Sequence, residues 1–435
     1  MFGYTQFDPL VVVGGTLLAV WYLQKAPVKL VSLMPAALSL WFFVPLITNL
    51  TLWQTIPMLL AGRLILKGRL FLPRNVQPVT LLLLAVFCLS VGFAIFAGSD
   101  TVRVLLRVVY YAGAFATFVF AYELGRRSDS HEALLKGFVV IGIVYAVYGV
   151  YQIIAFYADL PVRGIVYNDS GRGIIATQAG LPRINSLANE PKRLGFVLFL
   201  SSVACVWLAR TYRSRTAKWL RWAAGGIFAL SIATFSSSYF LALVLSGLAL
   251  LFLYPTGLTA KQLLALSVAA VLVLFGFGGE ILLAIEENLS SRATEVRLGL
   301  DNTVVYRQEI FAWDYVSKNP MTLLTGVGVG QYYYVLRDAY GVGVGINEYG
   351  GLVPINSNFV ELIFDLGGVA TILIYVGLAF VVVRLRLEKQ TFYCVTLLFL
   401  VFQSLFLLNL LYIGLMAGLA LGKLDLNRKF KSAPI

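Results

Sequence analysis

The sequence predicts an all-α polytopic integral membrane protein with about 12 transmembrane helices and two large, partly helical external loops. Three observations lead to this fold class. Hydrophobic residues make up 59% of the 435 residues and charged residues only 13%. Apolar runs recur from end to end at lengths near the roughly 20 residues that cross a bilayer. The formal net charge is +13, and the lysines and arginines gather in a few short connectors, as is typical of cytoplasmic loops.

The candidate membrane spans follow from these apolar runs. Arg63 weakens the third span, and the last is long enough to contain a broken or paired helix. The candidates cover about 9–23, 30–48, 51–66, 77–97, 104–123, 134–157, 194–210, 219–236, 239–254, 262–285, 356–383 and 391–422. The opening MFGYTQFDPLVVVGG has no early lysine or arginine. We therefore expect the first run to stay as a helix and not to act as a cleaved signal peptide.

Four basic connectors fix the expected topology. They are GRR at Gly125–Arg127, ARTYRSRTAKWLR at Ala209–Arg221, RLRLEK at Arg384–Lys389 and the tail KLDLNRKFK at Lys423–Lys431. All four can be cytoplasmic at once if the helices alternate in direction. The chain then divides into N-terminal helices (1–157), a first external loop (158–193), central helices (194–285), a large external loop (286–355) and C-terminal helices with a cytoplasmic tail (356–435).

The composition also excludes several kinds of site. Cys88, Cys205 and Cys394 lie in apolar runs and are interpreted as small buried residues, so we expect no disulfide framework. His131 is the one histidine of the sequence, and no cysteine lies near it. We therefore expect no metal site and no cofactor. The basic excess is explained by membrane topology, so no nucleic-acid partner is expected.

The external loops contain an unusual number of cations for the translocated side of a membrane. Arginine suits phosphate because its planar fork donates two parallel hydrogen bonds and stays charged, and lipid-linked pyrophosphates are anionic substrates that reach this face. The alternative is a cap of salt bridges with nearby acids. The loop cations are Arg163, Arg172, Arg183, Lys192, Arg193, Arg292, Arg297, Arg307 and Arg337.

Two pairs of charged residues share a helix face near the same boundary. Arg103 and Arg107 are four residues apart, and so are Glu361 and Asp365. The arginines could line the site or extend to lipid headgroups. Carboxylates at membrane depth normally face a cavity or a partner, so we expect Glu361 and Asp365 to line the site.

Glu190 precedes Pro191, which is suited to the first turn of a helix. Its carboxylate would be available as an acceptor or base. The alternative is that Glu190 caps the helix or pairs with Lys192 or Arg193. Further along, DNTVVYRQEIFAWDYVSKNP predicts a helix that ends at Asn319-Pro320, and a glycine-rich TGVGVGQYYYV follows it.

Four motifs follow one another along the chain. They are RINSLANEPKRLGF, TFSSSYFLAL, YRQEIFAWDYVSKNPMTLLTGVGVGQY and INSNFVELIFDLGGVATILIY. Their order and spacing resemble the bacterial superfamily of O-antigen ligases and Wzy-type polysaccharide polymerases, lipid-dependent glycosyltransferases of the C-type membrane fold. The Glu-Pro form of the first motif resembles exopolysaccharide polymerases in particular. The ligases carry a histidine where this sequence has Asn356, which favours a polymerase.

The resemblance implies a metal-independent reaction at the periplasmic side of the bacterial inner membrane. Arg183 and Arg307 match two external arginines that engage the pyrophosphate of an undecaprenyl-pyrophosphate-linked glycan donor. A hydroxyl of a second lipid-linked unit is the acceptor, and Glu190 is the candidate to orient or deprotonate it. The expected partners are this donor and acceptor, membrane lipid and a chain-length regulator. The expected substrate-binding residues are Lys192, Arg193, Arg163, Arg172, Arg297, Arg103, Arg107, Asn356, Glu361 and Asp365.

Two other functions remain open from the sequence. An O-antigen ligase would transfer the lipid-linked glycan to lipid A core. A flippase or exporter of lipid-linked oligosaccharide should carry charged residues through the depth of its helices, whereas the ionisable residues here cluster at helix ends and in loops. A structural or regulatory subunit would leave the external arginines unexplained.

Overall fold

The computed structural model describes a helical protein. The described residues are 34–35, 77–96, 101–160, 177–178, 181–182, 184, 186, 188, 191–212, 215–234, 236–253, 308–341, 344, 355, 357–405 and 409–432. Its elements are α4 (Gln77–Phe96), α5 (Thr101–Gly125), α6 (Ser128–Tyr157), β1 (Thr177–Gln178), β2 (Leu181–Pro182), α7 (Pro191–Thr211), α8 (Arg215–Ile232), α9 (Ser237–Leu253), α11 (Gln308–Lys318), α12 (Pro320–Thr325), α13 (Tyr332–Tyr340), α14 (Asn358–Leu366), α15 (Gly368–Leu387), α16 (Thr391–Gln403) and α17 (Leu410–Ser432). The strands β1 and β2 pair antiparallel.

Within the described residues, five helices are long and apolar enough to cross a membrane. They are α5, α6, α7, α15 and α17, and the shorter α9 and α16 are also apolar. This agrees with the predicted membrane protein, because a helix satisfies its own backbone hydrogen bonds where lipid offers none. The predicted spans 9–23, 51–66 and 262–285 lie outside the described residues, as does nearly all of 30–48. The full count of about 12 therefore stays a prediction.

Two predicted spans are divided in the structure. The 391–422 segment forms two helices, α16 and α17, which confirms the paired alternative. The 356–383 segment was expected to be one helix, and this is wrong because Gly367 breaks it into α14 and α15. Gly367 has φ 87°, a left-handed conformation that glycine adopts without steric cost. The acidic residues of this segment therefore lie on a separate short helix, α14.

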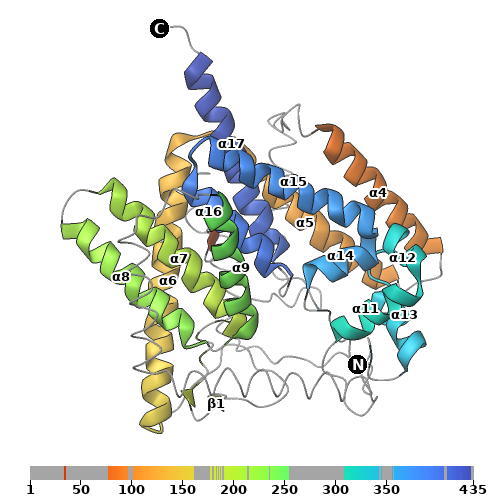
Figure 1. The fold of residues 1–435 in the computed structure, drawn as a ribbon, viewed down its shortest axis with the longest axis horizontal. Coiled ribbons are helices and arrows are strands. Elements are labelled where there is room, and N and C mark those ends of the chain that lie inside the picture. Colours follow the sequence, from red (N-terminus) through yellow and green to blue (C-terminus); the bar gives the residue numbers. More distant parts are fainter. Residues whose placement is uncertain are drawn as a thin grey trace.

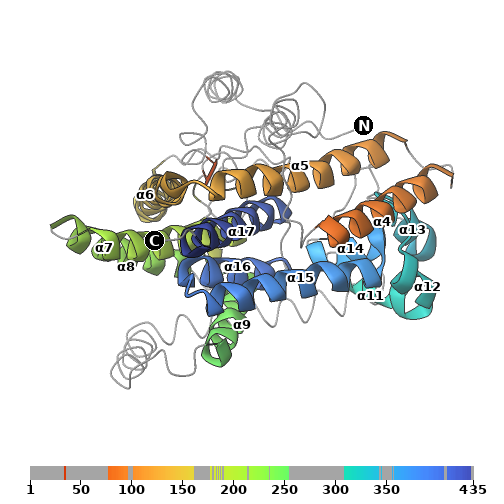
Figure 2. The same cartoon turned by 90° about the horizontal axis from the view of Figure 1, so that it is seen from above.

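The closest helix packing joins α5 and α17, which run side by side (Figure 2). Gly414, Gly418 and Gly422 are spaced four residues apart on α17, and each lies against the backbone of α5. A Cβ atom at Gly414 would come within 2.7 Å of the Ala114 carbonyl oxygen. Small residues at this spacing let membrane helices approach closely. The sequence YIGLMAGLALG thus explains why α17 lies directly on α5.

The remaining helices lie on two sides of this pair. In Figure 1, α6, α7 and α8 form a group on the left, and α4 with α11 to α14 lies on the right. The largest apolar core runs from α5 and α6 through α7 and α8 to α16 and α17. A second, smaller core joins α11 and α13 to α14, through residues such as Phe311, Tyr332 and Phe364. The described part of the 286–355 segment is therefore packed against α14.

The four basic connectors lie at one end of this bundle. The Tyr122 hydroxyl at the end of α5 bonds to Asp425 on α17. His131 at the start of α6 contacts the Gly125 carbonyl at 2.9 Å and the Tyr393 hydroxyl at the start of α16. The Tyr212 hydroxyl after α7 donates to Glu132 at 2.8 Å. These contacts tie the ends of α5, α7 and α17 to the starts of α6 and α16.

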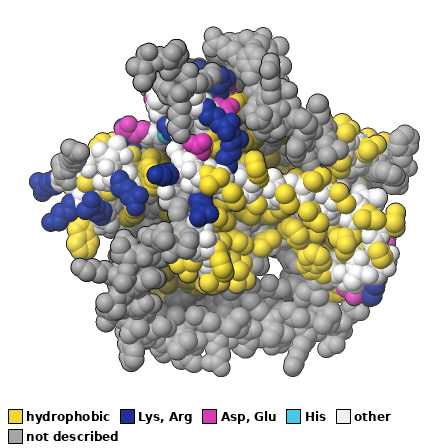
Figure 3. Space-filling model, turned by 45° about the horizontal axis from the view of Figure 1, so that its top comes forward, with side chains coloured by type: hydrophobic (Ala, Val, Ile, Leu, Met, Phe, Trp, Pro, Cys, Tyr) yellow, Lys and Arg dark blue, Asp and Glu magenta, His cyan; other side chains and the backbone are white. Residues whose placement is uncertain are grey.

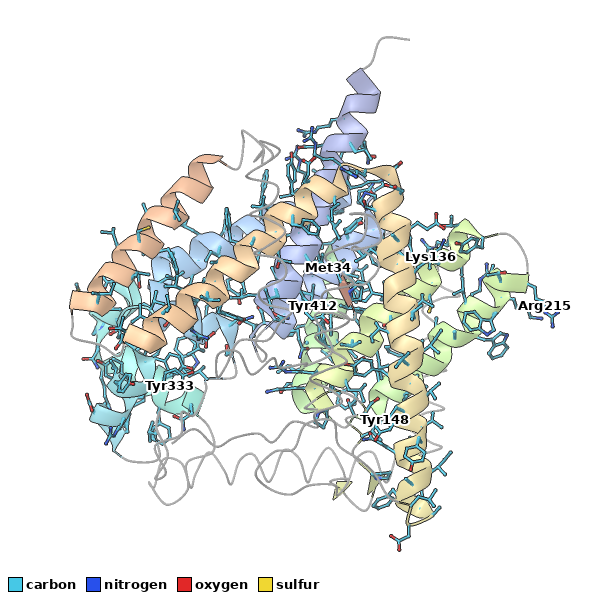
Figure 4. All side chains as sticks on the ribbon, turned by 180° about the vertical axis from the view of Figure 1, so that it is seen from behind. Met34, Lys136, Tyr148, Arg215, Tyr333 and Tyr412 are labelled. Carbon is cyan, nitrogen blue, oxygen red and sulfur yellow. The ribbon has the colours of Figure 1, made fainter. Side chains whose placement is uncertain are left out.

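The surface reflects this arrangement. Figure 3 shows Lys and Arg side chains toward the upper and left parts of one face, whereas hydrophobic side chains cover its centre and right. Arg384 and Arg428 line a common surface pocket where α15 and α17 end. In Figure 4, Lys136 and Arg215 lie on the side of the molecule away from Tyr333, which belongs to the α11–α13 group. The basic connectors thus lie apart from the α11–α13 group (Figure 4).

Candidate functional site

A buried ion cluster joins α5 to α14. Arg107 forms an ion pair with Glu361, and its Nε donates to Asp365 Oδ2 at 3.0 Å. The two carboxylate side chains have 0% exposure, and the Arg107 side chain has 13%. Glu361 and Asp365 are one turn apart on α14, so a single guanidinium reaches both. The expectation that Arg107 could extend to lipid headgroups is wrong, because its charge is used inside the protein.

The Asp365 carboxylate has donors on both oxygens. The Tyr111 hydroxyl donates to Oδ2 at 2.6 Å, and the Gly330 backbone N–H donates to Oδ1 at 3.0 Å. The Ser90 hydroxyl on α4 donates to the Asp365 carbonyl oxygen. Asp365 thus connects α4, α5 and the glycine-rich segment to α14. No sequence pattern indicated that Ser90, Tyr111 and Gly330 would meet here.

The glycine-rich segment TGVGVGQ lets the large loop dock on α14. Gly326, Gly328 and Gly330 have φ values of 74°, 101° and 75°, which side-chain-bearing residues rarely adopt. The Val327 N–H donates to the Phe364 carbonyl at 2.7 Å. A Cβ atom at Gly328 would lie 3.2 Å from Ala94 on α4. The backbone therefore passes between α4 and α14, and this brings the Gly330 N–H to Asp365.

Aromatic rings surround the Arg107 guanidinium. Its Cζ lies 5.3 Å from the ring centroid of Tyr110, 5.7 Å from that of Tyr111 and 5.8 Å from that of Tyr332. Such contacts add an electrostatic attraction between the cation and the ring faces. Burial and the neighbouring Tyr333 raise the pKa of Tyr332 well above its ordinary value. Its phenol therefore stays neutral at any ordinary pH.

The start of α7 lies next to this cluster. Pro191 begins α7, as the sequence predicted, so Lys192 and Arg193 lie in its first turn. Arg107 and Arg193 both interact electrostatically with the Tyr110 hydroxyl. The structure therefore brings three of the predicted site residues, Arg107, Glu361 and Asp365, into direct contact, and Arg193 acts on a tyrosine beside Arg107.

Described residues next to Arg183 are fixed to the helices around them. The Ile184 N–H donates to the Ala233 carbonyl at 3.4 Å, beside the predicted serine-rich turn. The Ser186 N–H donates to Gln152 Oε1 and the Ser186 hydroxyl donates to the Tyr145 carbonyl, each at 2.7 Å. The described part of the RINSLANEPKRLGF motif is thus anchored on α6 and at the end of α8.

A polar network holds the start of α14. Ser357 caps the helix by accepting from the Val360 N–H at 3.3 Å. Asn358 donates its side-chain amide to Asn409 at 3.0 Å and its backbone N–H to the Ser404 carbonyl at 2.9 Å. All of these groups are buried, so their hydrogen bonds fix α14 against α16 and α17. No motif in the sequence predicted this network; the asparagines beside apolar runs were the available signal.

Several predicted site residues lie outside the described residues. For Arg103 the structure describes the backbone, which belongs to α5. Within the described part of the chain, no group of three or more His, Cys, Asp or Glu side chains could hold a metal ion. The residues outside the description are Arg163, Arg172, Arg183, Glu190, Arg297, Arg307 and Asn356.

Comparison with known proteins adds no family assignment. No family model matches this chain, and no curated protein shows significant similarity to it. Interpretation of the site therefore depends on the motifs of the sequence and on the contacts described above.

Proposed function

We propose that this protein is a polysaccharide polymerase that joins undecaprenyl-pyrophosphate-linked oligosaccharide repeat units at the periplasmic face of the bacterial inner membrane. One observation carries the proposal. Arg107, Glu361 and Asp365 form a buried ion cluster between α5 and α14, next to the docked large loop and away from the basic connectors. This cluster fixes the segment after Arg307 to the spanning helices at one membrane boundary, where two anionic lipid-linked substrates would react.

The orientation follows from the basic connectors. Lysine and arginine in short loops favour the cytoplasmic side, and contacts such as those of His131 with Gly125 and Tyr393 bring these connectors to one end of the bundle. The start of α7 is the helix end opposite its basic connector. The start of α14 is likewise separated from the basic connector at 384–389 by the length of α15. This supports a site that faces the periplasm. In the polymerase family that the sequence resembles, lipid-linked repeat units are joined on that side.

The proposed reaction is a glycosyl transfer. An acceptor hydroxyl attacks the anomeric carbon of the donor, the anomeric C–O bond breaks, and undecaprenyl pyrophosphate leaves with the electron pair. Arg183 and Arg307 stabilise the negative charge that grows on this leaving group. Glu190 orients the hydroxyl and accepts its proton. Pyrophosphate is already a good leaving group, so the base contributes less than the arginines.

The buried ion cluster is assigned a positioning role in this proposal. Its charges are satisfied within the protein, so it does not compete for the substrate. Arg307 directly precedes α11, and α11 packs on α14 through Phe311. Asp365 and Gly330 join the same loop to α14. The cluster therefore determines where the segment that follows Arg307 lies relative to α5.

The distribution of charge also favours an enzyme over a flippase. In α5, α6, α7 and α15, the Asp, Glu, Lys and Arg residues lie toward the ends, as Arg107 and Glu123 do on α5, and the central turns contain none. A path for a charged headgroup would require polar groups through the membrane depth.

The test uses purified protein in liposomes with lipid-linked repeat units and measures polymer length on gels. Arg183→Ala and Arg307→Ala should each lower the initial rate about 100-fold or more, as does loss of a group that stabilises transition-state charge. Glu190→Gln should lower it less. Arg215→Ala, at an exposed site in a basic connector, is the matched control and should retain the full rate.

Two results would oppose the proposal. Full polymerisation by both arginine variants would exclude this site. Transfer of the glycan to added lipid A core, without chain growth in the absence of that acceptor, would identify a ligase instead.

A further inference from the structure

The short helix α12 exposes a cluster of apolar side chains. Met321 is 66% exposed and Leu324 is 55% exposed, and Leu323 between them is also exposed. α12 belongs to the large external loop, which the sequence predicted to be in water. Three exposed apolar residues in a six-residue helix are unfavourable in water, because apolar surface costs about 25 cal/mol per Å² there. The surface therefore requires an apolar environment.

α12 is continuous with the apolar surface of α15. The backbones of Leu323 and Leu324 lie directly against Gly367 and Gly368, where α15 begins. A Cβ atom at Gly368 would come within 3.0 Å of Leu323 Cδ1. The first turns of α15 expose Val369 and Ile372 beside them. Leu323 therefore connects the exposed apolar side chains of α12 to the start of α15.

Among the described candidate spans, α15 has the smallest share of its residues buried inside the protein, so it is the one most available to lipid. In the most apolar 18-residue stretch of α15, 28% of the residues are buried inside the protein, whereas in that of α7 the share is 67%. Its 20 residues span about 30 Å, which matches the hydrocarbon thickness of a bilayer. Arg384 and Arg386 lie at its far end, so Gly368 marks the opposite boundary. α12 lies at this boundary, level with the start of the membrane.

We infer that α12 lies within the membrane leaflet opposite the basic connectors and that its apolar face contacts phospholipid acyl chains together with Val369 and Ile372. The occupant is lipid because the surface continues the lipid-facing side of a spanning helix. Elsewhere in the described part of this segment, Trp313 on α11 is the exposed large apolar residue, and the other exposed side chains include Lys318 at the end of α11 and Asp338 on α13. The loop is thus seated in the membrane by α12 and faces water through α11 and α13.

The inference does not depend on the proposed reaction. It is tested with single-cysteine variants in which Cys88, Cys205 and Cys394 are first replaced by alanine. Met321→Cys and Leu324→Cys are labelled with the fluorophore NBD in phosphatidylcholine vesicles. Val376→Cys, exposed in the middle of α15, is the lipid control, and Asp338→Cys, exposed on α13, is the water control.

Each labelled protein is exposed to phosphatidylcholine that carries a doxyl quencher near the headgroup and, separately, to aqueous iodide. The ratio of doxyl to iodide quenching at position 321 should be several-fold higher than at 338 and close to that at 376. A ratio like that at 338 would place α12 in water and overturn the inference. Protection from both quenchers would mean that protein, such as a second copy of the chain, covers the surface, and this would also overturn it. Position 324 provides the same readout if the 321 variant does not fold.

Discussion

The buried ion cluster gives the sharpest stability prediction. Replacing Arg107 with methionine retains an unbranched apolar stem but removes the guanidinium. Glu361 and Asp365, both fully buried, then lack their cation. Breaking a buried ion pair by removal of one partner costs about 3–5 kcal/mol, because a charge remains buried without compensation. We therefore expect Arg107→Met to lower the free energy of unfolding by about this amount.

The structure also predicts which carboxylate causes the loss. Asp365 keeps the Tyr111 hydroxyl and the Gly330 N–H as donors. For Glu361, Arg107 is the ion-pair partner that the described part of the chain provides. Neutralising Glu361 in the Arg107→Met background should therefore restore stability. The double variant Arg107→Met/Glu361→Gln is expected to be more stable than Arg107→Met alone.

The assay is SDS-induced unfolding of the purified protein in mixed micelles, followed by circular dichroism. Arg126→Met is the control, since Arg126 pairs with Glu123 at side-chain exposures of 27% and 21% and such pairs contribute about 1 kcal/mol or less. The reasoning is refuted if Arg107→Met loses no more stability than Arg126→Met. It is equally refuted if the double variant is less stable than the Arg107 single variant.

Two further predictions concern packing and pH. Gly418→Ala should destabilise the protein by about 1–3 kcal/mol, because the new Cβ atom would overlap the α5 backbone. Gly247→Ala is the control and should not destabilise it, since there is open space around Gly247. Equal effects of the two substitutions in the same unfolding assay would contradict the packing of α17 on α5. The second concerns Asp314, whose pKa is lowered by the Lys318 ammonium and then by the Tyr340 hydroxyl. A carboxyl group whose pKa is lowered in the fold stabilises the protein at pH values above the pKa of the unfolded state. The contribution of Asp314 to stability should therefore persist down to about pH 4 and disappear in stronger acid. Thermal unfolding of wild type and Asp314→Asn from about pH 7 to about pH 3 checks this, and a loss already near pH 6 would contradict it.

Local sequence rules predicted several helix ends correctly. α7 begins at Pro191, and α11 ends at Lys318, before Asn319-Pro320. In both cases proline acts within one turn of the chain, because it fixes φ and lacks an N–H. Such effects need no distant partner, and a single sequence is sufficient to find them.

The break at Gly367 could not be predicted in this way. Apolar residues continue on both sides of it, so the pattern resembles one long span. The left-handed turn lets the Leu324 backbone pass directly against Gly367. A contact between segments that are 43 residues apart, from 324 to 367, leaves no mark on local hydrophobic periodicity.

The sequence by itself determined the class of the protein and the residues that could share a helix face. Lipid offers no hydrogen bonds to the backbone, so long apolar runs must form helices, and helical periodicity places Glu361 beside Asp365. The tertiary structure decided which distant residues meet. Arg107 pairs with acids more than 250 positions away, and Gly330 donates to one of them because three left-handed glycines bend the loop toward α14. Those contacts arise from helix packing and loop docking, which the order of residues along a single helix does not specify.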